Sequence, residues 1–283
     1  MASYILKLSC PDKIGIVAAV SNFLADNFCN IQDSDQFGDP ESKRFFMRVH
    51  FETEDKKLLR KDLQLRFADV AVRFGMDWKL EDFNKKAKIL IMASHLGHCL
   101  NDLIYRCSTG ILNAEIQAVV SNHQDFKALV ENQNIPFYHL PITKENKPVQ
   151  EEQIIKLADG LEVDLVVLAR YMQILTPEFC EYFKDRIINI HHSFLPGFKG
   201  AKPYHQAYAR GVKIIGATAH YVTANLDEGP IIEQEIERVD HSHTPEELSF
   251  VGRDVECLVL ARAVRYHVEH RILLNGNKTV VFK

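Results

Sequence analysis

Residues 187–200 read Ile187-Ile188-Asn189-Ile190-His191-His192-Ser193-Phe194-Leu195-Pro196-Gly197-Phe198-Lys199-Gly200, an apolar strand-like run that leads into a polar turn. His220 follows, and then the turn Asp227-Glu228-Gly229-Pro230. Asn189, His191 and Asp227 each stand beside a predicted strand end or turn. An amide, an imidazole and a carboxylate suit attack on a small acyl carbon, because donors stabilise an oxyanion and a base activates the nucleophile.

Apolar strand patterns and helical patterns alternate around this stretch. The apolar, β-branched runs are residues 89–93, 116–120, 165–168 and 187–190. Hydrophobicity on both sides is typical of parallel strands covered by helices. Helical patterns lie between them, and a final helix is predicted to begin with the capping box Thr244-Pro245-Glu246-Glu247. The sequence therefore predicts an open, mainly parallel α/β sheet, in which ligands bind beyond the carboxyl ends of the strands.

The first 82 residues have a different pattern, in the order β-α-β-β-α-β, which predicts a small ferredoxin-like domain. Asp12 is predicted to cap the first helix. Residues 83–86 form a short polar linker, so the predicted domains are 1–82 and 87–283.

Composition excludes several classes of function. The formal charge of the 283-residue chain is −4, so no overall basic field attracts nucleic acid or an anionic membrane surface. No apolar run is long enough to cross a bilayer, and the N-terminus has no signal-peptide pattern. The six cysteines are widely spaced, which favours reduced thiols and a cytoplasmic protein.

The predicted N-terminal domain resembles the ACT domain, a module that often senses amino acids. The similarity is clearest at Asp12-Lys13-Ile14-Gly15-Ile16-Val17, a turn between strand and helix. The resemblance implies that Asp12, Ile14 and Gly15 hold a regulatory amino acid. A dimerisation module without a ligand is an equal alternative, since fold does not determine function. A homo-oligomer is expected in either case.

The second domain resembles the folate-dependent formyltransferase domain. The similarity rests on Asn189-x-His191-x-Ser193, Leu195-Pro196-x-Phe198-Lys199-Gly200, His220 and Asp227. It implies that Asn189, His191 and Asp227 are catalytic. It also implies a pterin pocket between residues 171–175 and 222–227, with the substrate-binding set Met172, Gln173, Ile174, Leu175, His220, Val222 and Thr223. His220 has two open roles at this point, as an orienting partner of Asp227 or as a packed strand residue.

The turn after the first strand of this domain distinguishes two classes within the family. Transferases that formylate glycinamide ribonucleotide have a glycine-rich turn there for the acceptor phosphate. Here the turn is Ser94-His95-Leu96-Gly97-His98-Cys99, with a single glycine. With the ACT-like domain, this resembles the formyltetrahydrofolate deformylase family. The implied reaction hydrolyses 10-formyltetrahydrofolate to formate and tetrahydrofolate, which would supply formate for purine synthesis; transfer to glycinamide ribonucleotide is the alternative.

The implied mechanism gives each residue a role. Asp227 deprotonates the water or relays its proton, while Asn189 and His191 donate hydrogen bonds to the oxyanion. No cofactor or metal is expected, and the folate is the substrate. Asp240-His241-Ser242-His243 is the competing metal candidate. A methionyl-tRNA formyltransferase would need a basic region after the catalytic domain, which the sequence does not offer. A non-catalytic amino-acid sensor is the remaining alternative.

Overall fold

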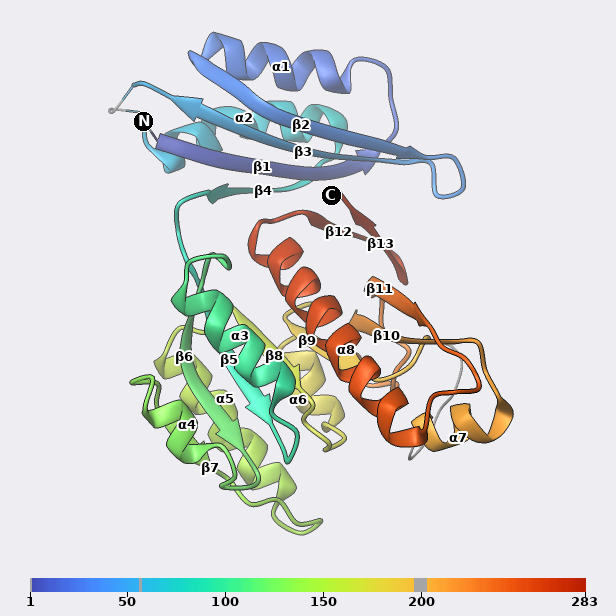
Figure 1. Cartoon of the computed structure of the whole chain (residues 1–283). Coiled ribbons are helices and arrows are strands. Elements are labelled where there is room, and N and C mark those ends of the chain that lie inside the picture. Colours follow the sequence, from blue (N-terminus) through green and yellow to red (C-terminus); the bar gives the residue numbers. More distant parts are fainter. Residues whose placement is uncertain (1, 56–57, 196–202) are drawn as a thin grey trace. The chain divides into compact units, whose positions relative to one another are not determined.

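The computed structural model describes residues 2–55, 58–195 and 203–283 (Figure 1). The chain divides into two compact units. The first contains Met1–Lys85 together with Glu269–Lys283, and the second contains Lys86–Val268. The sequence pattern placed residues 269–283 in the second domain, whereas their contacts group them with the first unit.

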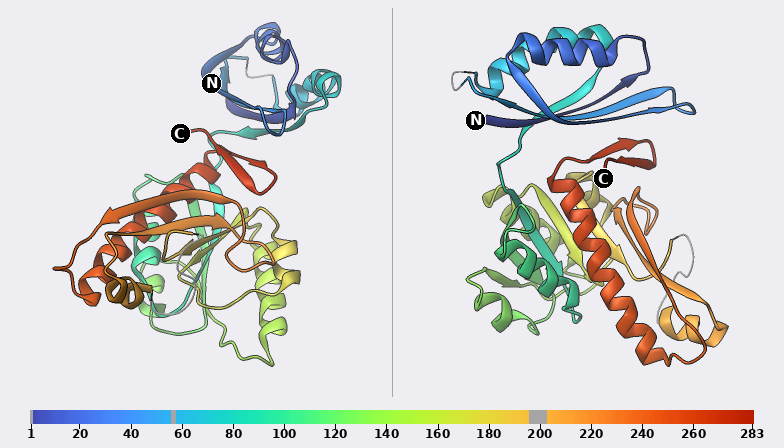
Figure 2. Two further views of the ribbon diagram at one scale, coloured as in Figure 1. Left: turned by 90° about the vertical axis from the view of Figure 1, so that its right-hand side faces the viewer. Right: turned by 45° about the horizontal axis from the view of Figure 1, so that its top comes forward.

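The first unit is a four-stranded antiparallel sheet in the order β2-β3-β1-β4. Its elements are β1 Ala2–Pro11, α1 Ile16–Asp26, β2 Cys29–Asp39, β3 Arg44–Thr53, α2 Arg60–Phe74 and β4 Asp77–Asp82. Both helices cover the same face of this sheet (Figure 2). The predicted ferredoxin-like βαββαβ fold is therefore confirmed.

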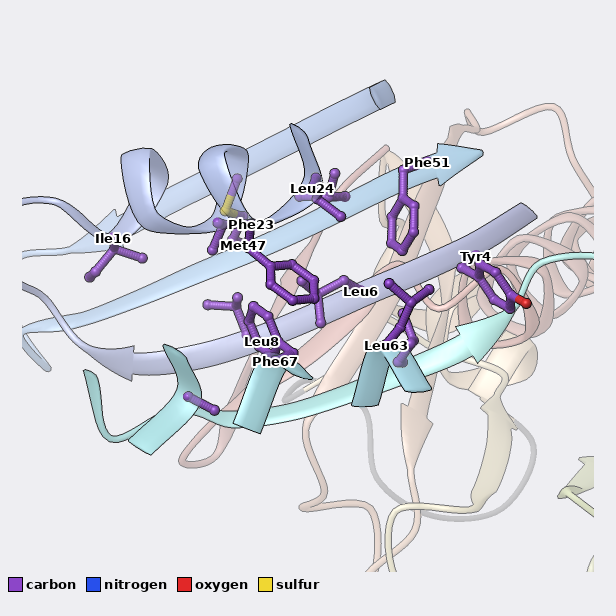
Figure 3. Close-up of a cluster of buried hydrophobic side chains, with 14 of the residues drawn as sticks. Tyr4, Leu6, Leu8, Ile16, Phe23, Leu24, Met47, Phe51, Leu63 and Phe67 are labelled. Carbon is purple, nitrogen blue, oxygen red and sulfur yellow. The ribbon is translucent and has the colours of Figure 1, made fainter. Parts of the chain in front are cut away.

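The core of this unit lies between the sheet and its two helices (Figure 3). Alternate residues of a strand face the same side, so β1 contributes Tyr4, Leu6 and Leu8. Phe67 of α2 contacts Phe23 of α1 edge to face, with ring centroids 5.0 Å apart. Burial of these apolar side chains holds the helices against the sheet.

The predicted capping role of Asp12 is wrong. Helix α1 begins at Ile16, and its N-cap residue is Gly15, which makes no side-chain hydrogen bond. Gly15 has φ 93°, a left-handed conformation that glycine adopts without steric cost. The chain thus enters the helix through a glycine turn, and Asp12 stays exposed outside it.

The other face of the first sheet contacts the C-terminal hairpin, made of β12 Ile272–Asn275 and β13 Lys278–Val281. Phe46 of β3 is fully buried against Leu273 and Phe282. Arg48, also on this face, is 1% exposed and donates hydrogen bonds to the carbonyl of Glu269. The alternating pattern of β3 did not reveal this second covered face, because the residues that cover it come from the far end of the chain.

The second unit contains a seven-stranded sheet in the order β11-β10-β9-β8-β5-β6-β7. Its strands are β5 Ala87–Ala93, β6 Ala114–Ser121, β7 Phe137–His139, β8 Leu165–Ala169, β9 Ile187–His191, β10 Ile214–Tyr221 and β11 Ile231–Arg238. The strands from β9 to β7 in this order pair in parallel, while β10 and β11 are antiparallel to their neighbours. The predicted open, mainly parallel α/β sheet is confirmed.

Helices cover both faces of this sheet. They are α3 His98–Ser108, α4 Lys127–Glu131, α5 Lys147–Gly160, α6 Pro177–Tyr182, α7 Pro203–Arg210 and α8 Pro245–Val268. Helices α5 and α6 share a core with β5, β6 and β8, and α8 packs on β9, β10 and β11 beside α3 and α7 (Figure 1). Among the residues described, none of these helices, α8 included, combines the length and apolar character of a membrane span.

The predicted capping box of α8 is confirmed. The Thr244 amide donates to the Glu247 carboxylate at 2.7 Å, and the Glu247 amide donates to Thr244 Oγ1 at 3.2 Å. These two reciprocal bonds satisfy backbone donors that the first helical turn leaves unpaired.

Gly252 of α8 makes room for the Tyr204 side chain of α7. A Cβ at this position would lie 2.1 Å from the Tyr204 hydroxyl. We expect Gly252→Ala to lower the free energy of unfolding by about 1–3 kcal/mol through overpacking. Urea denaturation followed by circular dichroism measures the change. Gly160→Ala is the control, because a Cβ there meets nothing within 4 Å; equal stability of the two variants would contradict the packing role.

Candidate active site

One cavity at the carboxyl ends of β8 and β9 is lined by every predicted catalytic and substrate-binding residue. It has a volume of about 250 Å³. Its lining includes Met172, Gln173, Ile174, Leu175, Asn189, His191, His220, Val222, Thr223 and Asp227. Asn189 and His191 lie at the carboxyl end of β9, and residues 170–175 follow the end of β8. The cavity therefore has the position that an open parallel sheet gives to a ligand site.

The register between β9 and β10 brings Asn189 and His220 together, since the two residues are direct partners across the antiparallel pair. The His220 Nδ1 lies 2.8 Å from the Tyr221 carbonyl, which can only accept, so Nδ1 is the protonated nitrogen. In neutral His220 the other nitrogen, Nε2, then accepts from the Asn189 side-chain amide at 3.3 Å. His220 thus orients the catalytic amide.

Asp227 is held in place by a tight turn between β10 and β11. Its φ is 56°, a conformation that aspartate adopts more readily than most residues but at some cost. Gly229 lies so close to β10 that a Cβ would sit 1.8 Å from the Tyr221 carbonyl oxygen. The Asp-Glu-Gly-Pro sequence therefore folds the turn directly against β10 and directs the carboxylate into the cavity.

Two histidines lie beside the Asp227 carboxylate. His191 Nδ1 lies 3.3 Å from Oδ2, and His220 Nε2 lies 3.7 Å from Oδ1. The hydrogen bond from His191 holds the pKa of Asp227 well below its usual value, although partial burial acts in the opposite direction. Asp227 is consequently ionised at neutral pH, and His191 Nδ1 must donate to it.

The other ring nitrogen of His191, Nε2, is buried and has no hydrogen-bond partner among the described residues. His191 itself is 7% exposed. Leaving a buried polar atom unpaired costs about 1–3 kcal/mol. Such atoms in native structures therefore usually bind a ligand or an ordered water. His191 lines the cavity, so this unpaired nitrogen belongs to a ring in the wall of the site.

The cavity has an apolar side and a polar end. Met172 and Ile174 are more than half exposed, and they line it with the buried Leu175 and with Val222. Exposed apolar side chains in a concave site suit a flat aromatic ligand. The polar end is formed by Arg170, Asn189, His191, His192, His220 and Asp227. A ligand with a ring at one end and a reactive polar group at the other fits this division.

The turn after β5 is closed by internal contacts. A Cβ at Gly97 would lie 2.4 Å from the Phe126 ring, so the single glycine is required for packing. Ser94 Oγ donates to Asn122 Oδ1 at 2.7 Å and accepts from the Met172 amide at 3.2 Å. His98 Nε2 lies 2.7 Å from the Glu256 carboxylate. The polar side chains of this turn are thus engaged by the protein itself.

Two groups among the described residues could supply three metal ligands, namely His95, His123 and Asp125, and His98, Cys99 and Glu256. The rings of His95 and His123 stack with centroids 3.5 Å apart and planes at 24°, so their in-plane lone pairs do not converge on one ion. In the second group the direct contact of His98 with Glu256 leaves no space for an ion between them. The earlier candidate around Asp240 forms a turn, in which His243 Nδ1 lies 3.1 Å from Asp240 Oδ1.

The residues predicted to bind a regulatory amino acid lie on the first unit, outside this cavity. Asp12, Ile14 and Gly15 are exposed. Two hollows on the first unit are lined by other residues, between 28 and 55 and between 60 and 81. The effector site therefore stays a prediction. The part of the formyltransferase-like motif from Pro196 to Gly200 lies outside the described residues.

Arg170 and Glu256 were not assigned a role from the sequence. Arg170 directly follows β8 and is 7% exposed. Glu256 lies on α8 and is 1% exposed. Nothing in the local pattern marks Glu256, because it occupies a helix position whose burial depends on α3 and α7 packing around it. Arg170 is a charge directly after the wholly apolar strand β8, and its role was left open between a solvated charge and a contact with the folate glutamate.

Comparison with known proteins supports these assignments of fold. Residues 87–264 match the family model described as formyl transferase, and residues 4–64 match the ACT domain. Formyltetrahydrofolate deformylase of Bacillus subtilis (strain 168) is 50% identical over 278 residues, which are 98% of this chain and 93% of that protein. The crystal structure of formyltetrahydrofolate deformylase from Burkholderia mallei has a TM-score of 0.95 and 51% identity, with 100% of both chains covered.

A transferase of the same fold is more distant. The crystal structure of phosphoribosylglycinamide formyltransferase from Anaplasma phagocytophilum has a TM-score of 0.65 and 32% identity, and it covers 70% of this chain and 96% of that chain. The deformylases match along both units and at higher identity. The chain belongs to the formyltetrahydrofolate deformylase family, with an ACT domain followed by a formyl transferase domain.

Proposed function

We propose that the chain hydrolyses 10-formyltetrahydrofolate to formate and tetrahydrofolate. The observation that carries this proposal is the convergence of an amide, an unpaired imidazole nitrogen and an ionised carboxylate at the polar end of one cavity. The pterin ring would lie on the apolar side between Ile174 and Val222. The formyl group would then lie at the polar end, within reach of these three groups.

The attacking water gives its proton to His191 Nε2. The sequence prediction assigned this proton to Asp227 and made His191 a donor to the oxyanion, but a carboxylate with a strongly lowered pKa is a weak base at neutral pH. Asp227 instead accepts the hydrogen bond from His191 Nδ1 and stabilises the imidazolium that forms, as the carboxylate of a catalytic triad does.

Bond changes then follow in two steps. The water oxygen bonds to the formyl carbon, and the formyl oxygen takes up negative charge, which the Asn189 amide stabilises with a hydrogen bond. The bond from carbon to N10 breaks next, its electron pair stays on N10, and His191 returns the proton there. The formic acid produced loses its own proton to solvent, so the products are formate, tetrahydrofolate and one proton.

Formyl transfer to glycinamide ribonucleotide is the second candidate. It would need a site for the ribonucleotide phosphate close to the formyl group. The packed glycine and the engaged side chains of the turn after β5 disfavour such a site. Water, which needs no site of that size, is the acceptor that these contacts allow.

Incubation of the purified chain with 10-formyltetrahydrofolate tests the proposal, with formate and tetrahydrofolate measured as products. We expect both products in equal amounts, at a rate that added glycinamide ribonucleotide leaves unchanged. Production of formylglycinamide ribonucleotide faster than formate would support the transferase. No consumption of the folate would leave the binding-only alternative.

The wider role follows from the same chemistry. The reaction would supply formate for purine synthesis and restore tetrahydrofolate to the one-carbon pool. We also propose that Asp12, Ile14 and Gly15 bind an amino-acid effector and that the ACT domain pairs with a second copy. The folate is then the substrate, with no separate cofactor, in a cytoplasmic enzyme whose cysteines are free.

A further inference from the structure

Arg170 is a buried cation that the hydrolytic steps above do not use. It follows β8 directly and lines the polar end of the cavity, yet it is 7% exposed. Its φ is 62°, an uncommon conformation for a residue with a long side chain. Arginine stays protonated in proteins, so a full positive charge is held at this point.

The nearest carboxylate, Glu256, is already engaged by other donors. Tyr204 donates to Oε1 at 2.7 Å, and His98 Nε2 lies 2.7 Å from Oε2. Burial acts to raise the pKa of Glu256, but His98, Arg170 and Tyr204 together hold it below its usual value, so the carboxylate is ionised. Glu256 thus balances the charge of Arg170 while both of its carboxylate oxygens have other hydrogen-bond partners.

The distance between the two groups supports this conclusion. Arg170 Nε lies 3.5 Å from Glu256 Oε2, and within the described residues this nitrogen makes no hydrogen bond. A guanidinium usually pairs with a carboxylate through two parallel hydrogen bonds. Because Arg170 Nε lacks such a bond, the guanidinium has donor capacity left for an anion in the cavity.

The residue next to the catalytic imidazole does not compete for this anion. Burial, and then the charge of Arg170, lower the pKa of His192 to about 4, so His192 is neutral at pH 7. The positive charge at this side of the polar end is therefore that of Arg170.

The proposed reaction creates a small anion at this place. Hydrolysis releases formate, whereas transfer to an amine releases a neutral formamide. We propose that Arg170 forms a binding site for a small carboxylate, which receives formate as it leaves the formyl carbon. This inference rests on the proposed function. It adds a product site in which Arg170 binds formate and the charge of Glu256 weakens that binding.

The glutamate of the folate is the other carboxylate source. It is joined to the end of the molecule away from the pterin. Because the polar end of the cavity holds the reacting carbon, the glutamate must extend toward solvent. The buried side chain of Arg170, among catalytic residues, is poorly placed for it. Substrates with and without the glutamate separate the two sources.

Inhibition of hydrolysis by added formate is the main test, with tetrahydrofolate release as the readout. In Arg170→Gln we expect the inhibition constant for formate to rise about 10- to 100-fold, the range for losing a charged hydrogen bond. The inhibition constant for tetrahydrofolate should stay within threefold, roughly the noise of context-dependent contacts. Arg186→Gln is the matched control, because Arg186 bonds to backbone carbonyls of Val163 and Tyr182 and is not part of the cavity lining.

Glu256→Gln provides a test in the opposite direction. Removing the balancing charge strengthens the field of Arg170, so the inhibition constant for formate should fall several-fold. Calorimetric titration of formate into the tetrahydrofolate complex measures the same affinity without turnover. This second variant and the wild-type titration decide the matter if Arg170→Gln does not fold.

The outcomes are distinct. Equal formate affinity in wild type and Arg170→Gln, or weaker affinity in Glu256→Gln, would overturn the formate site. If Arg170→Gln loses affinity for tetrahydrofolate but not for tetrahydropteroate, which lacks the glutamate, Arg170 serves the substrate tail instead. Failure of the wild type to produce any formate from the folate would refute the proposed function, and it is measured separately from formate binding.

Discussion

Asp227→Asn is expected to lower kcat by about 10⁴-fold, the loss seen when the carboxylate of an Asp–His pair is replaced by an amide. The amide cannot stabilise the imidazolium, and it allows His191 to present the wrong nitrogen to the water. The 3.3 Å contact between Asp227 and His191 is the reason for this expectation. Steady-state formate release measures the effect.

Asp185→Asn is a suitable control for the same substitution. Asp185 is an exposed aspartate with φ 60°, close to the 56° of Asp227, but it does not line the cavity. Its kcat should match that of the wild type. If Asp227→Asn kept kcat within tenfold of the wild type, Asp227 would have no part in proton transfer.

Asn189→Ala has the second largest expected effect. Loss of one oxyanion donor costs about 10²–10³ in kcat. Folate binding should stay nearly intact, because the amide acts on the formyl oxygen and the ring contacts lie on the apolar side of the cavity. The measurement compares kcat with the dissociation constant of tetrahydrofolate, which reports binding of the folate without its formyl group.

Asn225→Ala is the control for this variant. Asn225 lies two residues before Asp227, but it is exposed and is not part of the cavity lining. We expect its kcat to be unchanged. A wild-type kcat in Asn189→Ala would remove the amide from the mechanism, and an equal loss of tetrahydrofolate binding would assign it to the ring instead.

The sequence was most informative where one local pattern determines one element. Two-sided apolar runs such as 165–168 identified buried parallel strands, and Thr244 with Glu247 identified the start of α8. These features depend on periodicity and capping, which act within a few residues. The candidate residues Asn189 and Asp227 were also found this way, from strand ends and a turn.

Features that depend on distant parts of the chain were missed. The C-terminal hairpin covers Phe46 and Arg48, and no pattern in β3 predicts a partner more than two hundred residues away. Arg170 and Glu256 come together only when α8 packs beside α3. The orienting role of His220 likewise depends on the antiparallel register of β10 with β9, which the α/β pattern did not indicate.

The central claim is that water, rather than an amine, attacks the formyl carbon. Hydrolysis in ¹⁸O-labelled water, with the formate analysed by mass spectrometry, tests it most directly. We expect one labelled oxygen in each formate, released together with one tetrahydrofolate and without any added acceptor. Formate that carries no label, or folate that is consumed only when an amine acceptor is present, would contradict the account.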